Sequence, residues 1–128
     1  MDAHDLTLRR TIFESFAATG EPGAVEDVDG LRSLAARHVV VLDEEDRVVM
    51  AHPFAAHRDG ARVESDGREW WGSCAWDAFG IVAALGLRDA RVSAQGLTLE
   101  IRDGQVLGDA VFHVLVPAAH WWDDIAFT

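Results

Sequence analysis

The side chains in this sequence that are best suited to chemistry are a thiol and a carboxyl three positions apart. Cys74 is the only cysteine among the 128 residues, and Asp77 follows it at a helical spacing. Apolar residues continue from this pair at helical intervals as far as Leu85, and Gly86 suits the end of a helix. We therefore expect a helix that begins at Ser73 or Cys74, with the thiol in its first turn and Asp77 beside it on the inward face.

A thiol at the start of a helix is a candidate nucleophile. Backbone N–H groups and the helix macrodipole favour an anion there, so we expect the pKa of Cys74 to be lowered and the thiolate favoured. Burial of Asp77 beside it would favour the protonated carboxyl, because desolvation disfavours the charged form. The alternative is structural: a free cysteine is often a small buried side chain, and an aspartate near a helix start often serves the dipole or a cap.

The composition limits the class of protein. Nearly half of the residues are hydrophobic, which is ample for the core of one small domain or of two modules that share it. A single cysteine excludes an internal disulfide and any Cys-x-x-Cys zinc or redox motif. The formal net charge of −11 opposes binding to nucleic acid and to anionic membranes, and no apolar run is long enough to span a membrane. We expect a cytoplasmic protein.

Residues 1–51 have the pattern of a winged-helix-like module, with two amphipathic helices followed by a two-stranded ribbon. The ranges that we expect to form them are 5–18 and 30–37 for the helices and 38–42 and 47–50 for the strands. The turn of the ribbon, residues 43–46, is entirely acidic, whereas a wing that binds DNA needs Arg or Lys there. A packing or lid role is therefore expected for this module rather than DNA binding.

Residues 52–128 should form the second part of an α+β fold, a mostly antiparallel sheet with the Cys74 helix as its one packed core helix. Asp66-Gly67 is a strong signal for a two-residue turn between two strands. The strands that we expect are 61–65, 68–71, 90–94, 97–101 and 109–116, and a short helical turn should cover 117–122.

Three short motifs stand in a particular order along the chain. They are His52-Pro53-Phe54, Trp71-x-x-Cys74-Ala75-Trp76-Asp77 and Trp121-Trp122-Asp123-Asp124-Ile125-x-Phe127-Thr128. Together they make the sequence similar to the alkylmercury lyase (organomercurial lyase) family over nearly its whole length. The resemblance implies an N-terminal winged-helix-like domain joined to a catalytic domain. It also implies that Cys74 captures mercury as a thiolate and that Asp77 protonates the carbon as the carbon–mercury bond breaks.

The resemblance is incomplete in one respect that bears on activity. Catalytic members of the family carry a second mercury-binding cysteine in the C-terminal part of the domain, whereas this chain has only Cys74 and ends at Thr128, close to where that residue is expected. Either the natural chain extends further or efficient cleavage is impaired. Mercury prefers thiolate ligands, so another subunit's Cys74, a buffer thiol or a histidine would have to supply the second ligand. The resemblance implies no required cofactor, with Hg(II) held at Cys74 as the product.

Four further residues are candidates to line a pocket for a small organometallic or apolar molecule. They are Trp71, Trp76, His113 and Trp121. The structural alternative is that the tryptophans fill the core and that His113 is an ordinary core histidine. Two other functions stay open: a binding module that holds a soft metal, an organometal or an apolar ligand without turnover, and a structural or regulatory protein. A homodimer is compatible with each of them.

Overall fold

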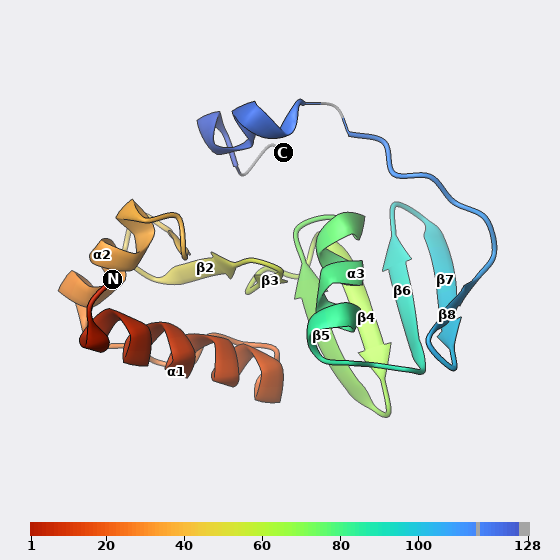
Figure 1. Cartoon of the computed structure of the whole chain (residues 1–128), viewed down its shortest axis with the longest axis horizontal. Coiled ribbons are helices and arrows are strands. Elements are labelled where there is room, and N and C mark those ends of the chain that lie inside the picture. The colour runs from red at the N-terminus through yellow and green to blue at the C-terminus, as the bar shows by residue number, and fades with distance from the viewer. Residues whose placement is uncertain (115, 126–128) are drawn as a thin grey trace.

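The computed structural model describes residues 1–114 and 116–125, which form helices and strands in two groups (Figure 1). The helices are α1 (Ala3–Thr19), α2 (Val28–Ala36) and α3 (Ala75–Ala84), followed near the C-terminus by the 3-10 helix η1 (Ala118–Asp123). The strands are β1 (Val41–Leu42), β2 (Val48–Ala51), β3 (Phe54–Ala55), β4 (Ala61–Ser65), β5 (Arg68–Gly72), β6 (Ala90–Ala94), β7 (Leu97–Arg102) and β8 (Gln105–Leu107).

The strands form two antiparallel sheets, one at each side of the molecule. The smaller sheet has the order β1-β2-β3 and lies with α1 and α2, while the larger has the order β5-β4-β6-β7-β8 and carries α3 (Figure 1). This arrangement confirms the expected α+β fold. Among the described residues, no helix is both long and apolar enough to cross a membrane.

The two N-terminal helices begin at aspartate caps. Asp2 accepts a hydrogen bond from the Asp5 N–H at 2.8 Å, and Asp27 accepts one from the Gly30 N–H at 2.9 Å. α1 ends at Gly20, whose φ of 79° suits a left-handed C-cap. The side chains that these helices and the smaller sheet bury include Ile12, Phe16, Leu31, Leu34 and Val40. The two helices and the ribbon are confirmed, but the first strand is limited to Val41–Leu42 of the predicted 38–42, and β3 extends the ribbon to three strands.

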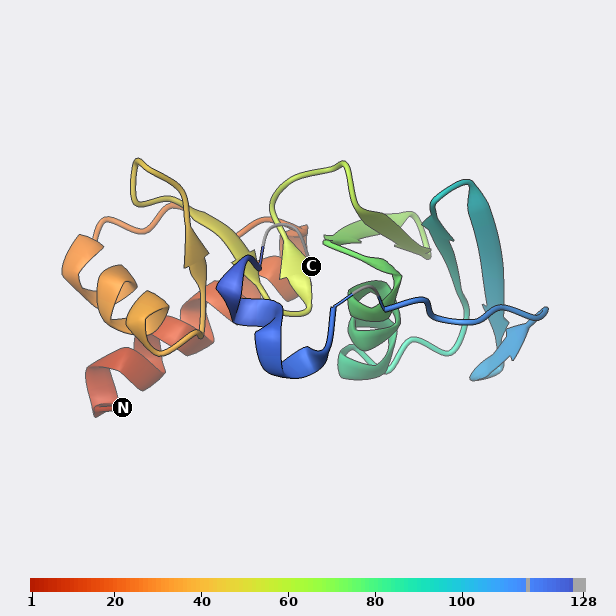
Figure 2. The same cartoon turned by 90° about the horizontal axis from the view of Figure 1, so that it is seen from above.

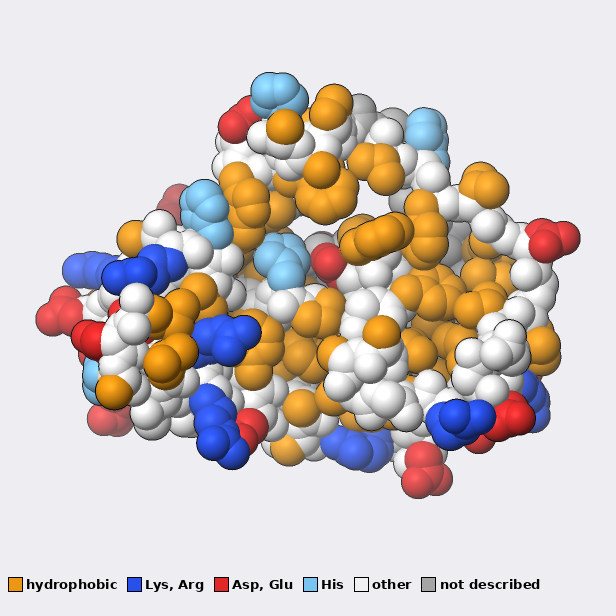
Figure 3. Space-filling view, viewed as in Figure 1, with side chains coloured by type: hydrophobic (Ala, Val, Ile, Leu, Met, Phe, Trp, Pro, Cys, Tyr) orange, Lys and Arg blue, Asp and Glu red, His pale blue; other side chains and the backbone are white. Residues whose placement is uncertain are grey.

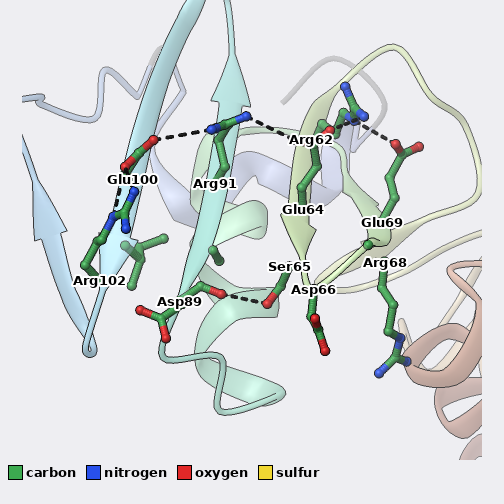
Figure 4. A pocket seen from close by; sticks show the side chains of 13 residues that line it. Arg62, Glu64, Ser65, Asp66, Arg68, Glu69, Asp89, Arg91, Glu100 and Arg102 are labelled. Atoms are coloured by element: carbon green, nitrogen blue, oxygen red, sulfur yellow. Dashed lines mark hydrogen bonds and ion pairs between the residues drawn. The ribbon is translucent and has the colours of Figure 1, made fainter.

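The larger sheet buries one face on the side of α3 and leaves the other face charged. Its β4–β5 hairpin turns through Asp66 and Gly67, both with positive φ, as the sequence predicts. The buried residues on the α3 side are Ala61, Val63, Trp70, Val92 and Ile101 from the strands and Ala78 and Ile81 from the helix. The opposite face carries arginine and glutamate side chains in neighbouring ion pairs (Figure 4). Alternation along each strand thus fixes which face receives α3.

The two parts of the chain share one hydrophobic core. Phe54 of β3 stacks on Phe16 of α1 with 5.3 Å between the ring centroids. Trp70 of β5 donates its Nε1–H to the Ala17 carbonyl at 3.0 Å, close to the end of α1. These contacts hold the N-terminal helices against the larger sheet. The division of the chain into residues 1–51 and a second domain remains a prediction.

After β8 the chain leaves the larger sheet and crosses back past the start of α3 (Figures 1 and 2). Gly108 has a φ of 106°, a conformation that side chains rarely adopt, and beyond it the chain is extended and exposed. The segment then enters η1 beside the N-terminal part of the molecule (Figure 2). The helical turn predicted at 117–122 is confirmed.

The strand predicted at 109–116 is wrong. Residues 109–114 are extended but pair with no other strand in the described part of the chain, and residue 115 lies outside it. Within residues 109–114, Phe112 packs on α3 and Val111 is 93% exposed. An apolar run becomes a strand only where the edge of a sheet is available to pair with it. Here Phe112 contacts helix α3 instead.

Truncation of two neighbouring tryptophans on β5 should have very different effects. Trp70 is 1% exposed within the core, whereas Trp71 lies partly buried on the outer face. We expect Trp70→Ala to lower the free energy of unfolding by about 3–5 kcal/mol, because a buried ring is replaced by a cavity. Trp71→Ala should cost less than half as much. Urea denaturation measures both, and equal losses would contradict the register of β5.

Candidate active site

A tight turn from β5 into α3 sets the position of the thiol. Two glycines make it possible: a Cβ on Gly72 would lie 2.8 Å from the Asp77 Cβ, and one on Gly60 would lie 2.2 Å from the Gly72 carbonyl oxygen. Neither position has room for a side chain. Cys74 follows as the N-cap of α3, with extended backbone at φ −148° and ψ 174° and a partly buried side chain. Of the two residues proposed from the sequence, Cys74 rather than Ser73 is the N-cap, and α3 itself begins at Ala75.

The thiol is subject to opposing influences on its protonation. Burial has the largest effect and raises the pKa of Cys74. The backbone N–H groups of Asp77 and Trp76 lower that pKa, as expected at a helix start, while the charge and hydrogen bonding of the Asp77 carboxyl raise it. The net pKa is above the ordinary value, so the predicted lowering is wrong. Loss of water around the sulfur outweighs the effect of the helix start.

Asp77 has a second chemical neighbour besides the thiol. Its side chain is 15% exposed, and its Oδ2 lies 3.6 Å from Nδ1 of His52, whose side chain is 30% exposed. His52 occupies the loop between β2 and β3, and its Nε2 is buried with no hydrogen-bond partner among the described residues. The carboxyl is therefore close to a sulfur on its own helix and to an imidazole from a distant loop.

The C-terminal segment reaches the same place through Trp122 of η1. The Trp122 ring meets the His52 ring nearly at right angles, with centroids 5.7 Å apart, and stacks on His38 at 4.1 Å. Figure 3 shows a hollow beneath this segment, with hydrophobic side chains around it and histidine and acidic side chains at its edge. The loop, helix α3 and the C-terminal segment therefore converge around His52 and Asp77.

Polar contacts also fix the backbone just before the thiol. The Ser73 hydroxyl donates to the Met50 sulfur at 3.2 Å and lies 3.5 Å from Nε2 of His57. The other ring nitrogen of His57 pairs with Asp59. Ser73 is thus held from the smaller sheet and from the loop before β4, which restricts movement at the entry to α3.

Comparison with known proteins identifies the family of this chain. The sequence model of the family described as alkylmercury lyase matches residues 54–128, more than half of the chain and the part that contains Cys74 and Asp77. The chain belongs to the alkylmercury lyase family. No curated protein matches it.

One solved structure, described as the crystal structure of the mercury-bound form of MerB2, is similar to this member of the family. The likeness has a TM-score of 0.63 and 18% sequence identity, and it covers 84% of this chain and 60% of the MerB2 chain. At that identity it shows a common fold. This chain therefore corresponds to about three fifths of the length of the MerB2 chain.

Within this lyase-family fold, two of the predicted pocket residues, Trp76 and Trp71, contact side chains other than His52 and Asp77. Trp76 is in the first turn of α3 beside Asp77 but is 59% exposed, and its ring meets Phe112 edge to face at 5.2 Å. Trp71 lies on the outer face of the larger sheet, where its Nε1–H donates to Glu69 at 2.8 Å. Trp71 is thus directed to the face of the sheet opposite α3.

The other two predicted pocket residues belong to the C-terminal segment. His113 is exposed on the extended stretch and is not part of a strand. Trp121 donates its Nε1–H to the Val116 carbonyl at 2.7 Å, within its own segment. His52 and Trp122, which do meet near Asp77, are not among the predicted site residues, although both stand in the motifs that resemble the family. Nothing local in those motifs indicates which ring turns toward the carboxyl.

The thiol of Cys74 was the one predicted metal ligand. Within residues 1–114 and 116–125, no group of three or more His, Cys, Asp or Glu side chains is gathered to hold a metal ion. A soft ion that accepts two ligands is the kind that a lone thiolate can bind with help from one further donor.

The raised pKa of Cys74 predicts slow alkylation at neutral pH. Because less thiolate is present, iodoacetamide should modify Cys74 more slowly than free cysteine at pH 7, and the rate should still increase above the pH at which free cysteine levels off. Asp77→Asn should accelerate the reaction, since the carboxyl raises the thiol pKa. Mass spectrometry over time measures the rates. Asp66→Asn in the distant β4–β5 turn is the matched control, and a Cys74 more reactive than free cysteine would contradict the prediction.

Proposed function

We propose that this chain cleaves organomercurials by protonolysis, with Cys74 as the mercury ligand and Asp77 as the proton donor. The observation that supports this most is the placement of the two groups. The thiol caps α3, and the carboxyl in the first turn is close enough to influence the protonation of the sulfur. Both residues lie in the region matched by the alkylmercury lyase family.

The raised pKa means that the thiol keeps its proton until mercury binds. The proposed mechanism passes this proton from the sulfur to Asp77 and then to the carbon. As the sulfur binds the mercury of an organomercurial, the S–H bond breaks, an S–Hg bond forms and the previous ligand of mercury leaves. The Asp77 carboxylate accepts that proton. It then gives the proton to the carbon, which receives it with the electron pair of the breaking carbon–mercury bond and leaves as the hydrocarbon.

Mercury remains on the sulfur after cleavage and needs a second ligand to replace the carbon. Cys74 is the single thiol of these 128 residues, so the proposal assigns that place to a thiolate from solution. A second thiolate from solution then displaces the Cys74 sulfur and carries Hg(II) away as the dithiolate complex, and Cys74 takes up a proton again from water. A second candidate function follows from the same observation. With one thiol, the site would bind a soft metal or an organometal and release no hydrocarbon.

Phenylmercury with excess free thiol distinguishes these two functions. We expect the protein to release benzene, Cys74→Ser to release none above background, and Asp77→Asn to be slower by on the order of a hundredfold or more, because general-acid catalysis contributes that much. Gas chromatography of the headspace measures benzene. Trp71→Phe on the far face of the sheet is the control and should remain active.

The outcome that removes the lyase proposal is benzene release no faster than that of Cys74→Ser. Mercury bound to Cys74 without benzene would favour the binding function instead, and it is detected as a mass increase that Cys74→Ser lacks.

A further inference from the structure

We propose that His52 is a positioning residue for Asp77, holding its carboxyl in the orientation that exchanges a proton with the thiol and with substrate. The inference rests on the proposed function and names a residue that acts on the same site. Its basis is a convergence of three parts of the chain: the β2–β3 loop, the first turn of α3 and η1.

His52 and Asp77 form a close pair between a loop and a helix. His52 Nδ1 lies 3.6 Å from Asp77 Oδ2, within ion-pair range but longer than a direct hydrogen bond. Both side chains are largely shielded from water, which strengthens their interaction relative to an exposed pair. Contacts of this kind often shorten when substrate binds, so a long approach in the free protein is compatible with a role in the reaction.

The other nitrogen of the His52 ring, Nε2, is buried without a hydrogen-bond partner in the described part of the chain. Buried polar atoms are nearly always paired, so an unpaired one calls for an explanation, and a catalytic role is one of those known. Burial of an imidazole in this position is explained if its Nδ1 is needed at Asp77.

The His52 ring is fixed from two sides. Pro53 follows His52 and lies directly against α3, where a Cβ on Gly80 would be 3.1 Å from the Pro53 Cβ. On the other side the Trp122 ring meets the imidazole at 86°. The loop is thus anchored one turn beyond Asp77 and the ring is held by η1, so Nδ1 is presented to the carboxyl from a rigid support.

A carboxyl held at one oxygen has fewer orientations than a free one. The proposed reaction uses Asp77 twice, once to accept the thiol proton and once to donate it to carbon. Both transfers depend on placement, and a displacement of about 1 Å can cost on the order of a hundredfold in rate. Orientation by His52 should therefore appear in kcat and leave KM nearly unchanged.

Three substitutions separate positioning from packing. His52→Asn keeps an amide N–H near the position of Nδ1, His52→Gln places it near the position of Nε2, and His52→Leu has neither. We expect His52→Leu and His52→Gln to lower kcat for benzene release from phenylmercury by on the order of tenfold or more, and His52→Asn to restore most of it. His4→Leu is the control, because it removes the exposed His4–Asp27 pair on the N-terminal helices.

A second measurement does not depend on lyase activity. The Asp77 carboxyl affects the Cys74 thiol, so a carboxyl released by His52→Leu should change the rate at which iodoacetamide alkylates Cys74. If His52 acts through Asp77, the same substitution in an Asp77→Asn background should have no further effect. Thermal melting of each variant shows whether it is folded, and His52→Gln replaces His52→Leu if the latter is not.

The outcomes separate this inference from the lyase proposal. Benzene release that is absent in the wild type, together with alkylation rates that follow the expected cycle, removes the lyase function and supports positioning of Asp77 by His52. Wild-type kcat in His52→Leu with unchanged alkylation overturns the inference and leaves the lyase function intact. Equal loss in His52→Asn and His52→Leu, or an effect that persists with Asp77→Asn, also overturns it.

Discussion

The close approach of strand β5 to helix α3 is the constraint on which the candidate site depends. The end of the strand passes so near the helix that a Cβ on Gly72 would lie 2.8 Å from the Asp77 Cβ. This approach fixes where α3 starts, with Cys74 as its N-cap, and the helical spacing then places Asp77 beside the thiol. A site built on a strand and a helix holds its geometry better than one built on a loop.

Burial raises the pKa of this thiol, whereas its position at a helix start would by itself lower that pKa. A cysteine at a helix start receives N–H groups that favour the thiolate, but the packing of α3 removes water from the sulfur and the neighbouring carboxyl opposes a second negative charge. Chemistry at such a site depends on where the thiol proton goes when a metal binds. The same carboxyl that disfavours the thiolate is the group best placed to take the proton, which links the electrostatics of the free site to the proposed reaction.

The N-terminal part and the C-terminal segment both contribute to this site, although neither contains the thiol. The β2–β3 loop supplies His52, and η1 supplies Trp122, whose ring contacts both His38 and His52. The stacking of Phe54 on Phe16 ties that loop to α1. The β2–β3 loop, which follows the acidic ribbon turn in the chain, thus carries a residue beside Asp77.

Residues close together in the chain are sufficient to predict the local elements, which are the helix after Cys74, the turn at Asp66-Gly67 and the two N-terminal helices. The same spacing places the thiol and the carboxyl on one helical turn. Long-range packing instead determines that burial outweighs the helix start at the sulfur, that residues 109–114 pair with no strand of the described chain, and that Trp122 meets His52. Solvation of a group and the partner of a ring depend on segments far apart in sequence, which short-range patterns do not encode.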